Sequence, residues 1–189
     1  MQDKVWSIKE KKRMLRIPFL FFLIFLICSC VGKPSPDDPK LSELNLNLED
    51  FFDGEVVAYG QFQDRFGTVR SRFKVDILGT FDGKTLILEE SFVYSDNSSQ
   101  NRTWTLLKLN DSEWKGSAPD VIGDAKGKEI GDLFNWQYNI DLPVGDDLLR
   151  VKFDDWMWLL SDDRLLNKAY VQKYGFNLGE VIIYFEKIS

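Results

Sequence analysis

Histidine is absent from the 189 residues, and cysteine occurs only at Cys28 and Cys30. Without histidine the chain has no Ser-His-Asp or Cys-His catalytic group, no His-ligated zinc and no histidine general base. Both cysteines lie within the first 30 residues, so the rest of the chain has no thiol to form a disulfide. A domain formed by that part of the chain has to be stable through its core alone.

Motifs for cofactors and metals are also missing. The glycines at Gly123, Gly127 and Gly131 do not have the spacing of a dinucleotide-binding fingerprint or a P-loop. They are expected to serve a hairpin turn and close approach of backbone. No calcium-loop spacing of the EF-hand kind occurs. We therefore predict no cofactor, no metal site and no catalytic residue.

The N-terminal region has the pattern of a leader. A basic stretch, Lys9–Arg16, precedes an apolar core, Ile17–Cys28. This core has the length of a signal-peptide h-region and is shorter than the roughly 20 residues that a membrane-spanning helix needs. We predict that residues 1–29 are cleaved; an uncleaved N-terminal anchor is the alternative. Met14 is an alternative start that leaves a more compact leader.

The end of this leader carries a lipidation signal. Ile27-Cys28-Ser29-Cys30 resembles the lipobox of bacterial lipoproteins, in which a small residue precedes the lipidated cysteine. Cys30 is the predicted site, because lipidation at Cys28 would put the bulky Ile27 at the cleavage position. Several acyl chains on one residue hold a protein stably at a membrane. Val31, where the lipoprotein sorting rule puts Asp for the inner membrane, implies the periplasmic face of the outer membrane.

The remaining chain divides into a tether and one domain. Residues 30–40 contain three prolines and are expected to form an extended tether of up to ~25 Å. Residues 41–189 have the length of a single domain with its own core. Removing the leader changes the formal charge from −6 to −10. Such an acidic domain does not hold nucleic acid through phosphate contacts.

Apolar and polar residues alternate almost throughout from Gly54 onward, most clearly over Val69–Ile77 and Phe134–Leu142. This period of two is typical of half-buried antiparallel strands. Eight turn signals separate the strands: Asp64–Gly67, Asp82–Gly83, Ser95–Gln100, Asn110–Ser112, Lys126–Lys128, Pro143–Asp147, Ser161–Arg164 and Gly175–Asn177. They predict a mainly β fold, an up-and-down barrel of about nine strands, with a short helix within Leu41–Phe52. A two-sheet sandwich is the alternative.

Several motifs resemble the DUF3833 family of proteobacterial lipoproteins: Glu90–Tyr94, Arg102–Trp104, Gly116–Ala125 with Gly131, Asp154-Asp155-Trp156-Met157, Asn167, Lys173–Gly175 and Gly179-Glu180. The resemblance covers nearly all of Leu48–Lys187. The sequence differs from the family's usual residues at Asp96-Asn97 and Gly131-Asp132, and these differences affect the details of turns. The resemblance implies a lipocalin-like barrel and favours a lipid ligand. It assigns no activity.

A polar cluster is predicted inside the barrel or at its mouth. Glu90 shares a strand face with Leu88, and Arg102 shares a face with Trp104 on the next strand of the same predicted hairpin. A buried charge without a partner is very costly, so Glu90 and Arg102 are expected to approach each other. Asp155 also lies on an apolar face. This cluster of Glu90, Arg102 and Asp155 either fixes strand register, binds the head group of a ligand or takes part in catalysis.

Large aromatic residues form the second candidate feature. Four of them are predicted to line a cavity for an apolar ligand, with core filling as the alternative: Trp104, Trp136, Tyr138 and Tyr170. Trp156 and Trp158 have the opposite parity from the apolar residues of their strand. They are expected to form a surface patch that faces solvent, a partner or the membrane.

Three functions from different classes follow from these features. The first is a lipocalin-like protein that binds or carries a fatty acyl or similar apolar ligand. The second is an accessory module of the cell envelope that docks on a protein partner through the Trp156/Trp158 patch. The third is an enzyme acting on lipids, which would need a carboxyl of raised pKa in a dry pocket.

Overall fold

The computed structural model describes residues 32–40, 43–144 and 147–188. The chain from Ser35 onward forms one compact unit. Within it a short helix precedes ten antiparallel strands: α3 (Leu48–Phe52), β1 (Gly54–Asp64), β2 (Val69–Phe81), β3 (Thr85–Tyr94), β4 (Ser99–Lys108), β5 (Glu113–Ser117), β6 (Ala125–Ile130), β7 (Leu133–Val144), β8 (Asp147–Ser161), β9 (Arg164–Lys173) and β10 (Phe176–Ile188).

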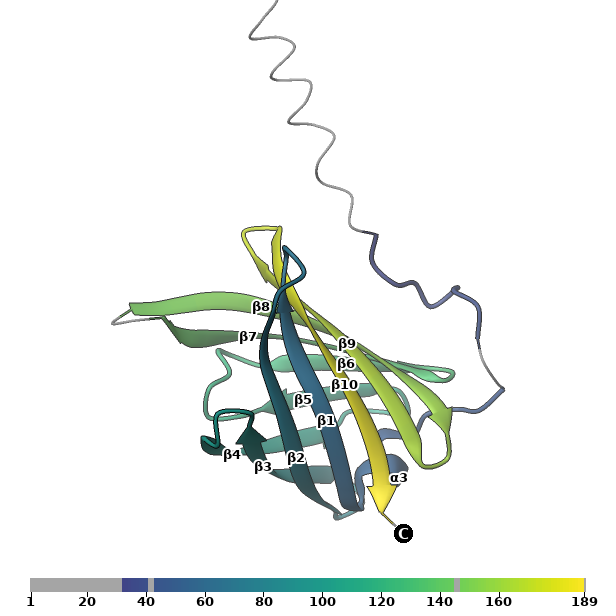
Figure 1. The fold of residues 1–189 in the computed structure, drawn as a ribbon. Helices are drawn as coiled ribbons and strands as arrows, with labels where there is room; N and C mark the ends of the chain where they lie inside the picture. The colour runs from purple at the N-terminus through teal and green to yellow at the C-terminus, as the bar shows by residue number, and fades with distance from the viewer. Residues whose placement is uncertain (1–31, 41–42, 145–146, 189) are drawn as a thin grey trace, which may run out of the picture. The chain divides into compact units, whose positions relative to one another are not determined.

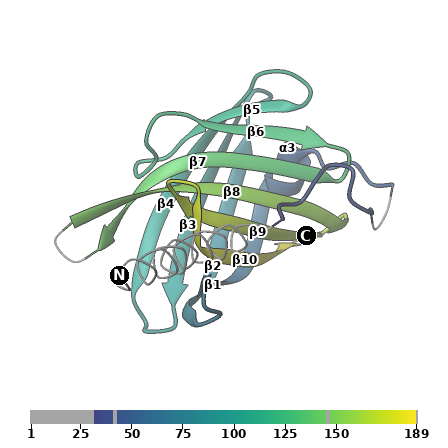
Figure 2. The same cartoon turned by 90° about the horizontal axis from the view of Figure 1, so that it is seen from above.

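Each strand pairs with its neighbours in sequence, and the first strand pairs with the last, so the sheet closes into a barrel (Figures 1 and 2). The closing pair runs from Glu55 opposite Ile188 to Asp64 opposite Gly179. Because side chains alternate along a strand, each strand sends one set of residues into the barrel. Closure also pairs the first and last strands, whose edges an open meander of this length would expose. The short strands β5 and β6 cover only part of their neighbours, since β4 pairs with β5 over Thr105–Lys108 and β7 pairs with β6 over Leu133–Gln137.

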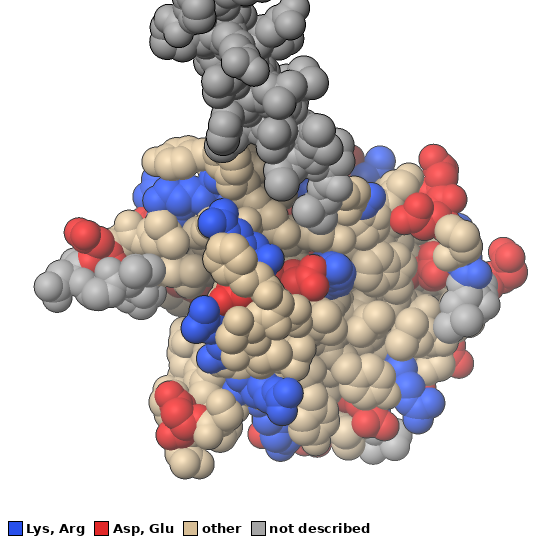
Figure 3. All heavy atoms as spheres, turned by 45° about the horizontal axis from the view of Figure 1, so that its top comes forward, with Lys and Arg blue, Asp and Glu red and all other residues tan. Residues whose placement is uncertain are grey.

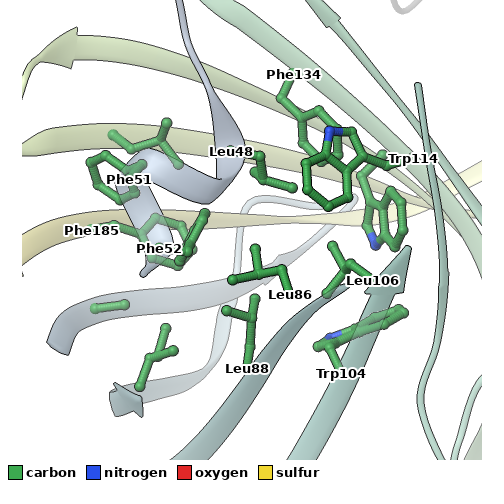
Figure 4. Packing of buried hydrophobic residues seen from close by; sticks show 14 of the residues in the cluster. Leu48, Phe51, Phe52, Leu86, Leu88, Trp104, Leu106, Trp114, Phe134 and Phe185 are labelled. Atoms are coloured by element: carbon green, nitrogen blue, oxygen red, sulfur yellow. The ribbon is translucent and has the colours of Figure 1, made fainter. Parts of the chain in front are cut away.

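Helix α3 closes one end of the barrel, where β10 ends (Figure 1). Its apolar side chains Leu48, Phe51 and Phe52 are buried, and the ring of Phe52 packs edge-on against Phe185 of β10 with centroids 5.6 Å apart. Figure 4 shows these residues packed with Leu86 of β3 and other core side chains. The helix therefore acts as an apolar plug.

Polar groups hold the plug at both of its ends. The backbone N–H of Leu48 donates to Glu129 Oε1 at 2.8 Å, and the indole N–H of Trp114 donates to the same atom at 3.0 Å. At the other end Lys187 Nζ donates to the carbonyls of Asp50 and Asp53 at 2.7 and 2.6 Å. Free N–H and C=O groups at helix ends need such partners when they are buried.

The predicted antiparallel up-and-down barrel with a short N-terminal helix is confirmed. It has ten strands because the turn predicted at Lys126–Lys128 is wrong: these residues lie inside β6. The connections actually fall at 118–124 and at Gly131-Asp132, on either side of that strand. Gly131 has a φ of 63°, a left-handed conformation that glycine adopts without strain.

The segment before the helix contains one hydrogen-bonded turn. Residues 32–40 contain no helix or strand. The backbone N–H of Asp38 donates to the carbonyl of Ser35 at 3.0 Å, and Asp38 Oδ2 accepts from the N–H of Ser35 at 2.8 Å. That these residues serve as a tether stays a prediction from the sequence.

The outer face of the barrel carries the charged residues that alternate with the core residues. On the face turned forward in Figure 3, side chains of both signs are separated by uncharged ones. Within the ranges that the structure describes, none of the helices has the length and apolar character needed to cross a bilayer.

Adding a methyl group at Gly79 tests the plug. A Cβ atom there would lie 1.7 Å from the backbone carbonyl oxygen of Phe52, so α3 would have to move. We expect Gly79→Ala to lower the free energy of unfolding by roughly 3 kcal/mol, at the upper end for overpacked sites. Urea titration measures this. Thr80→Ala, at an exposed position of the same strand, is the control and should stay within about 0.5 kcal/mol of the parent. Equal stability of both variants would show that α3 does not rest on β2.

Candidate ligand-binding site

A cavity of about 270 Å³ lies inside the barrel. This volume is just below the usual range for small-molecule sites, about 300 to 1,000 Å³. Apolar and aromatic side chains from α3 and from most of the strands make up much of its wall, and a group of polar side chains interrupts them on β3, β4, β8, β9 and the loop after β5. Such a combination, an apolar wall with a few convergent polar groups, is typical of ligand pockets.

Arg102 is the centre of the polar group. It lies directly opposite Glu90 in the β3–β4 ladder, as the strand pattern predicted. Its guanidinium carbon is 4.4 Å from the ring centroid of Trp104 and 5.7 Å from that of Tyr138. Its Nε is 3.2 Å from Asp120 Oδ1. The cation is therefore held by two aromatic faces and by carboxylates.

Asp120 reaches this cluster from the loop between β5 and β6. The loop lies along β7, because Val121 forms a bridge with Ile140 and the N–H of Ile122 donates to the carbonyl of Asn139 at 2.8 Å. The side chain of Asp120 is 36% exposed, whereas that of Arg102 is 14% exposed. The loop thus places one carboxylate at the boundary between cavity and solvent.

A second acidic group lies on the β8 and β9 side of the cavity. Asp155 faces inward beside Trp136, its partner on β7, and the hydroxyl of Tyr138 donates to Asp155 Oδ2 at 3.5 Å. Asn167 of β9 lies next to it and interacts with its carboxyl. Asp155 and Asn167 are only 5% and 2% exposed. Within the described part of the chain, neither of their Oδ1 atoms accepts a hydrogen bond.

Glu90, Asp155 and Tyr138 have raised pKa values. Burial raises the pKa of Glu90 to about 7, although Arg102 opposes this shift. Burial also raises the pKa of Asp155 to about 8, again against the effect of Arg102. Burial raises the pKa of the Tyr138 phenol well above its usual value. In each case the dry surroundings disfavour the charged form, and one guanidinium does not compensate for several carboxyls.

The structure brings Glu90, Arg102 and Asp155 to one cavity, together with Trp104, Trp136 and Tyr138. Tyr170 is different. It pairs with Asp154 across β8 and β9, and Asp154 is the neighbour of inward-facing Asp155, so both side chains lie on the outer face. The prediction that Tyr170 lines the cavity is therefore corrected. It is still largely buried, with Lys168 Nζ 5.1 Å from its ring centroid.

The Asp154-Asp155-Trp156-Met157 motif divides between the two faces of β8. Asp155 and Met157 line the cavity, whereas Asp154 and Trp156 face outward. Asp154 accepts hydrogen bonds from the side-chain amides of Asn135 and Gln137 at 3.0 and 3.1 Å. It is thus buried within a polar network on the outside of the sheet.

Trp156 and Trp158 both lie on the outer face of β8, opposite in parity to the inward-facing residues of that strand. Both side chains are half-buried rather than exposed. They are therefore placed outside the barrel, and much of their apolar surface is already covered within the chain.

Sequence reasoning did not assign Asp120 and Asn167 to the site. Asp120 lies in a loop, where no periodicity indicates which way a side chain points. Asn167 has the parity of Leu165 and Ala169, two buried residues of the same strand. That alternation was the signal that could have found it.

The carboxyls around Arg102 do not resemble a metal centre. Within the described ranges, no group of three or more potential acidic or sulfur ligands could hold an ion. The polar cluster therefore consists of hydrogen-bonding and charged groups of the chain itself.

Comparison with known proteins identifies the family of this chain. The profile of the family described as a protein of unknown function (DUF3833) matches residues 24–187. The chain belongs to the DUF3833 family. A comparison with curated proteins found no match.

Among solved structures, this DUF3833 protein is similar to the S-type phycobiliprotein lyase CPES from Guillardia theta. The TM-score is 0.55 at 11% sequence identity, over 76% of this chain and 94% of the other. A redesigned beta barrel also matches, with a TM-score of 0.40 and 7% identity, over 80% of this chain and all of the other. At 11% identity the likeness to the lyase shows the fold, a lipocalin-like barrel.

The raised pKa values of Glu90 and Asp155 predict how stability depends on pH. Above pH 5 the unfolded chain has released protons that the folded chain still holds, so the free energy of unfolding falls as the pH rises from 5 to 8. Asp155→Asn removes the part of this decrease that is due to Asp155. We expect that part to be on the order of 3 kcal/mol between pH 5 and pH 8. Urea titrations at several pH values measure the slope.

Asp162→Asn is the matched control, because Asp162 is an exposed residue outside the cavity. It should leave the slope of the parent unchanged. A parent whose stability stays constant or increases between pH 5 and 8 would contradict the assignment of buried, protonated acids. Burial raises the pKa of Glu129 as well, so Glu129 also contributes to the pH dependence of the parent. The contribution of Asp155 is therefore the difference between the slope of the parent and the slope of Asp155→Asn.

Proposed function

We propose that this DUF3833 protein is a membrane-anchored lipoprotein whose barrel binds or carries an apolar small molecule of the fatty acyl or lipid kind. The observation that carries the proposal is the cavity, which joins an apolar wall to a buried polar cluster. If the barrel served stability alone, apolar side chains that fill this space would stabilise the fold more than a cavity lined by acids does. The polar cluster supports orientation of a ligand head group.

The size of the cavity limits what enters it completely. A volume of about 270 Å³ corresponds to roughly nine water-sized groups at about 30 Å³ each. A chain of eight to ten carbon atoms fits this space, and a longer acyl chain would extend past Asp120 into solvent. Tryptophan and phenylalanine rings along the wall offer the apolar contact that such a chain needs.

The anchoring part of the proposal rests on the sequence. Leader residues 1–29, Met14, Cys28 and Cys30 lie outside the described residues. The lipobox-like Ile27–Cys30 supports acylation at Cys30, and Val31 supports the periplasmic face of the outer membrane. A ligand-binding barrel held in this way would meet its ligand at a membrane surface.

A second candidate function is acid–base chemistry on the bound molecule. The observation that favours it is the pKa of Glu90, about 7, and that of Asp155, about 8. Carboxyls with pKa values near the working pH are suited to general acid–base catalysis. The two functions can be distinguished by the fate of the ligand, because a carrier releases it unchanged and an enzyme releases a product.

Native mass spectrometry of the full chain, followed by denaturing extraction, tests the binding function. We expect one apolar molecule per chain after purification from a lipid-producing host, and the same molecule after prolonged incubation. Chemical conversion of the ligand would favour the enzyme instead. A protein that is bare and also refuses added fatty acids and phospholipids would contradict the proposal and favour the docking module.

Two phenylalanine variants locate the bound molecule. Val181 lines the cavity and is only half-buried, so Val181→Phe has space to grow into the cavity and should reduce ligand occupancy by at least fivefold. Ile87→Phe introduces the same side chain at an exposed position of β3 and should retain full occupancy. Thermal melting of both variants confirms that each is folded. Equal occupancy in both would place the ligand outside the barrel.

Metabolic labelling with a clickable fatty acid tests the anchor. We expect Cys30→Ser to lose the label and to leave the membrane fraction, because it removes the sulfur that is acylated. Cys28→Ser should keep both. If Cys28→Ser loses the label instead, the lipidated residue is Cys28, and if both variants remain labelled, the lipoprotein assignment is wrong.

A further inference from the structure

The polar end of the cavity contains more acceptors than donors. Arg102 is the one basic side chain among the lining residues, and three carboxylic acids share the cavity with it: Glu90, Asp120 and Asp155. Asp120 already lies 3.2 Å from the guanidinium. With all three acids ionised, the cavity would therefore carry two negative charges in excess.

The inward-facing residues of the other strands do not change this balance. The ionisable side chains that line the cavity come from β3, β4, the β5–β6 loop, β7 and β8: Glu90, Tyr94, Arg102, Asp120, Tyr138 and Asp155. The residues that β2, β9 and β10 contribute to the cavity are Phe73, Asn167, Val181, Ile183 and Phe185, and none of them is ionisable.

Two acceptor atoms on adjacent strands remain unfilled. Asp155 Oδ1 and Asn167 Oδ1 are fully buried and accept no hydrogen bond from any described residue. Asn167 pairs with Met157 in the ladder, two residues along β8 from Asp155, so the two acceptors lie on the same inner face. A buried polar atom left without a partner costs roughly 1 to 3 kcal/mol. The side chain of Asn167 lies beside the carboxyl of Asp155, so the proton of Asp155 serves this pair while that carboxyl is neutral. Once Asp155 is ionised, the two acceptors need a donor from outside the chain.

We propose, building on the binding function above, that the ligand carries a primary amine, and that its ammonium group sits between Asp155 and Asn167 while its apolar part lies along the aromatic wall. An ammonium offers three N–H donors and one positive charge. It therefore fills both acceptors and offsets one of the excess negative charges. A carboxylate head would find charged donors among the lining residues only on Arg102, whose Nε and Nη2 donate no hydrogen bond to a described residue, and it would also meet the carboxyls of Glu90 and Asp155.

Binding of the ammonium also moves protons. Burial keeps Asp155 protonated near neutral pH, and the incoming cation stabilises its carboxylate form. The carboxyl then releases its proton to solvent as the N–H···O contact forms. The uptake of an amine at pH 7 should therefore be accompanied by release of up to one proton per ligand.

Calorimetric titration of the full chain with octylamine, octanol and octanoate tests the head group at nearly constant chain length. We expect octylamine to bind at least tenfold more tightly than octanoate at pH 7, with octanol between them. Titration in two buffers of different ionisation enthalpy measures the proton released with octylamine. Octanol should release none.

An acidic protein also attracts amines without specificity, so two Asp→Asn variants are compared. Asp155→Asn should reduce octylamine affinity to that of octanol and abolish proton release, while octanol binding stays within about twofold. Asp162→Asn makes the same substitution at an exposed site and should bind all three like the parent. If Asp155→Asn does not fold, the number of protons that the parent releases per bound octylamine tests the proposal.

The possible results separate this proposal from the binding function. Octanol or octanoate binding as tightly as octylamine, or octylamine binding without proton release, overturns the amine assignment and leaves the binding function standing. An octylamine preference that Asp162→Asn removes equally would be non-specific attraction and also overturns the assignment. If none of the three binds, both proposals fail.

Discussion

A guanidinium buried inside an apolar barrel is the constraint on which the interior of this DUF3833 protein depends. Arg102 is tolerated because Glu90 opposes it in the ladder, Asp120 approaches from a loop and two aromatic rings cover its faces. Taking a charge out of water costs several kcal/mol unless such partners are in place. Once the partners are assembled, they bring more acid than one cation balances. Burial raises the pKa of Glu90 and of Asp155, and the Oδ1 atoms of Asp155 and Asn167 accept no hydrogen bond from a described residue.

The two ends of the barrel consequently differ in chemistry. The end that holds α3 is sealed by apolar packing, and its few polar groups, Glu129 and Lys187, are used to fix the helix. The region around Asp120 is instead polar and partly open to solvent. A bound molecule too long for the cavity would therefore protrude at the end around Asp120 and not at the end that α3 closes.

Most of the correct predictions from the sequence came from the alternation of apolar and polar residues along the strands. It placed Glu90, Arg102 and Asp155 on inner faces because a period of two assigns each side chain to one face once its neighbours are apolar. Tyr170 was assigned to the cavity by its size, against the parity of its strand, and lies outside. Asp120 could not be placed, because a loop has no period and its position depends on the bridge between Val121 and Ile140. Residues 126–128 of β6 were predicted as a turn around Gly127. In the strand, the missing side chain of Gly127 instead lets the Phe134 ring lie against the backbone.

The pairing of β1 with β10 also affects how the chain acquires its fold. Each other contact in the barrel joins strands that are neighbours along the chain, and these hairpins can form as synthesis proceeds. The last contact joins residues more than a hundred positions apart, and loop closure over such a distance is entropically costly. Until β10 has emerged, β1 and β9 both present bare edges, and the cavity has no wall between them. Any folding intermediate in which β1 and β10 are not yet paired therefore exposes two sheet edges, and pairing between copies of the chain competes with closure of the barrel.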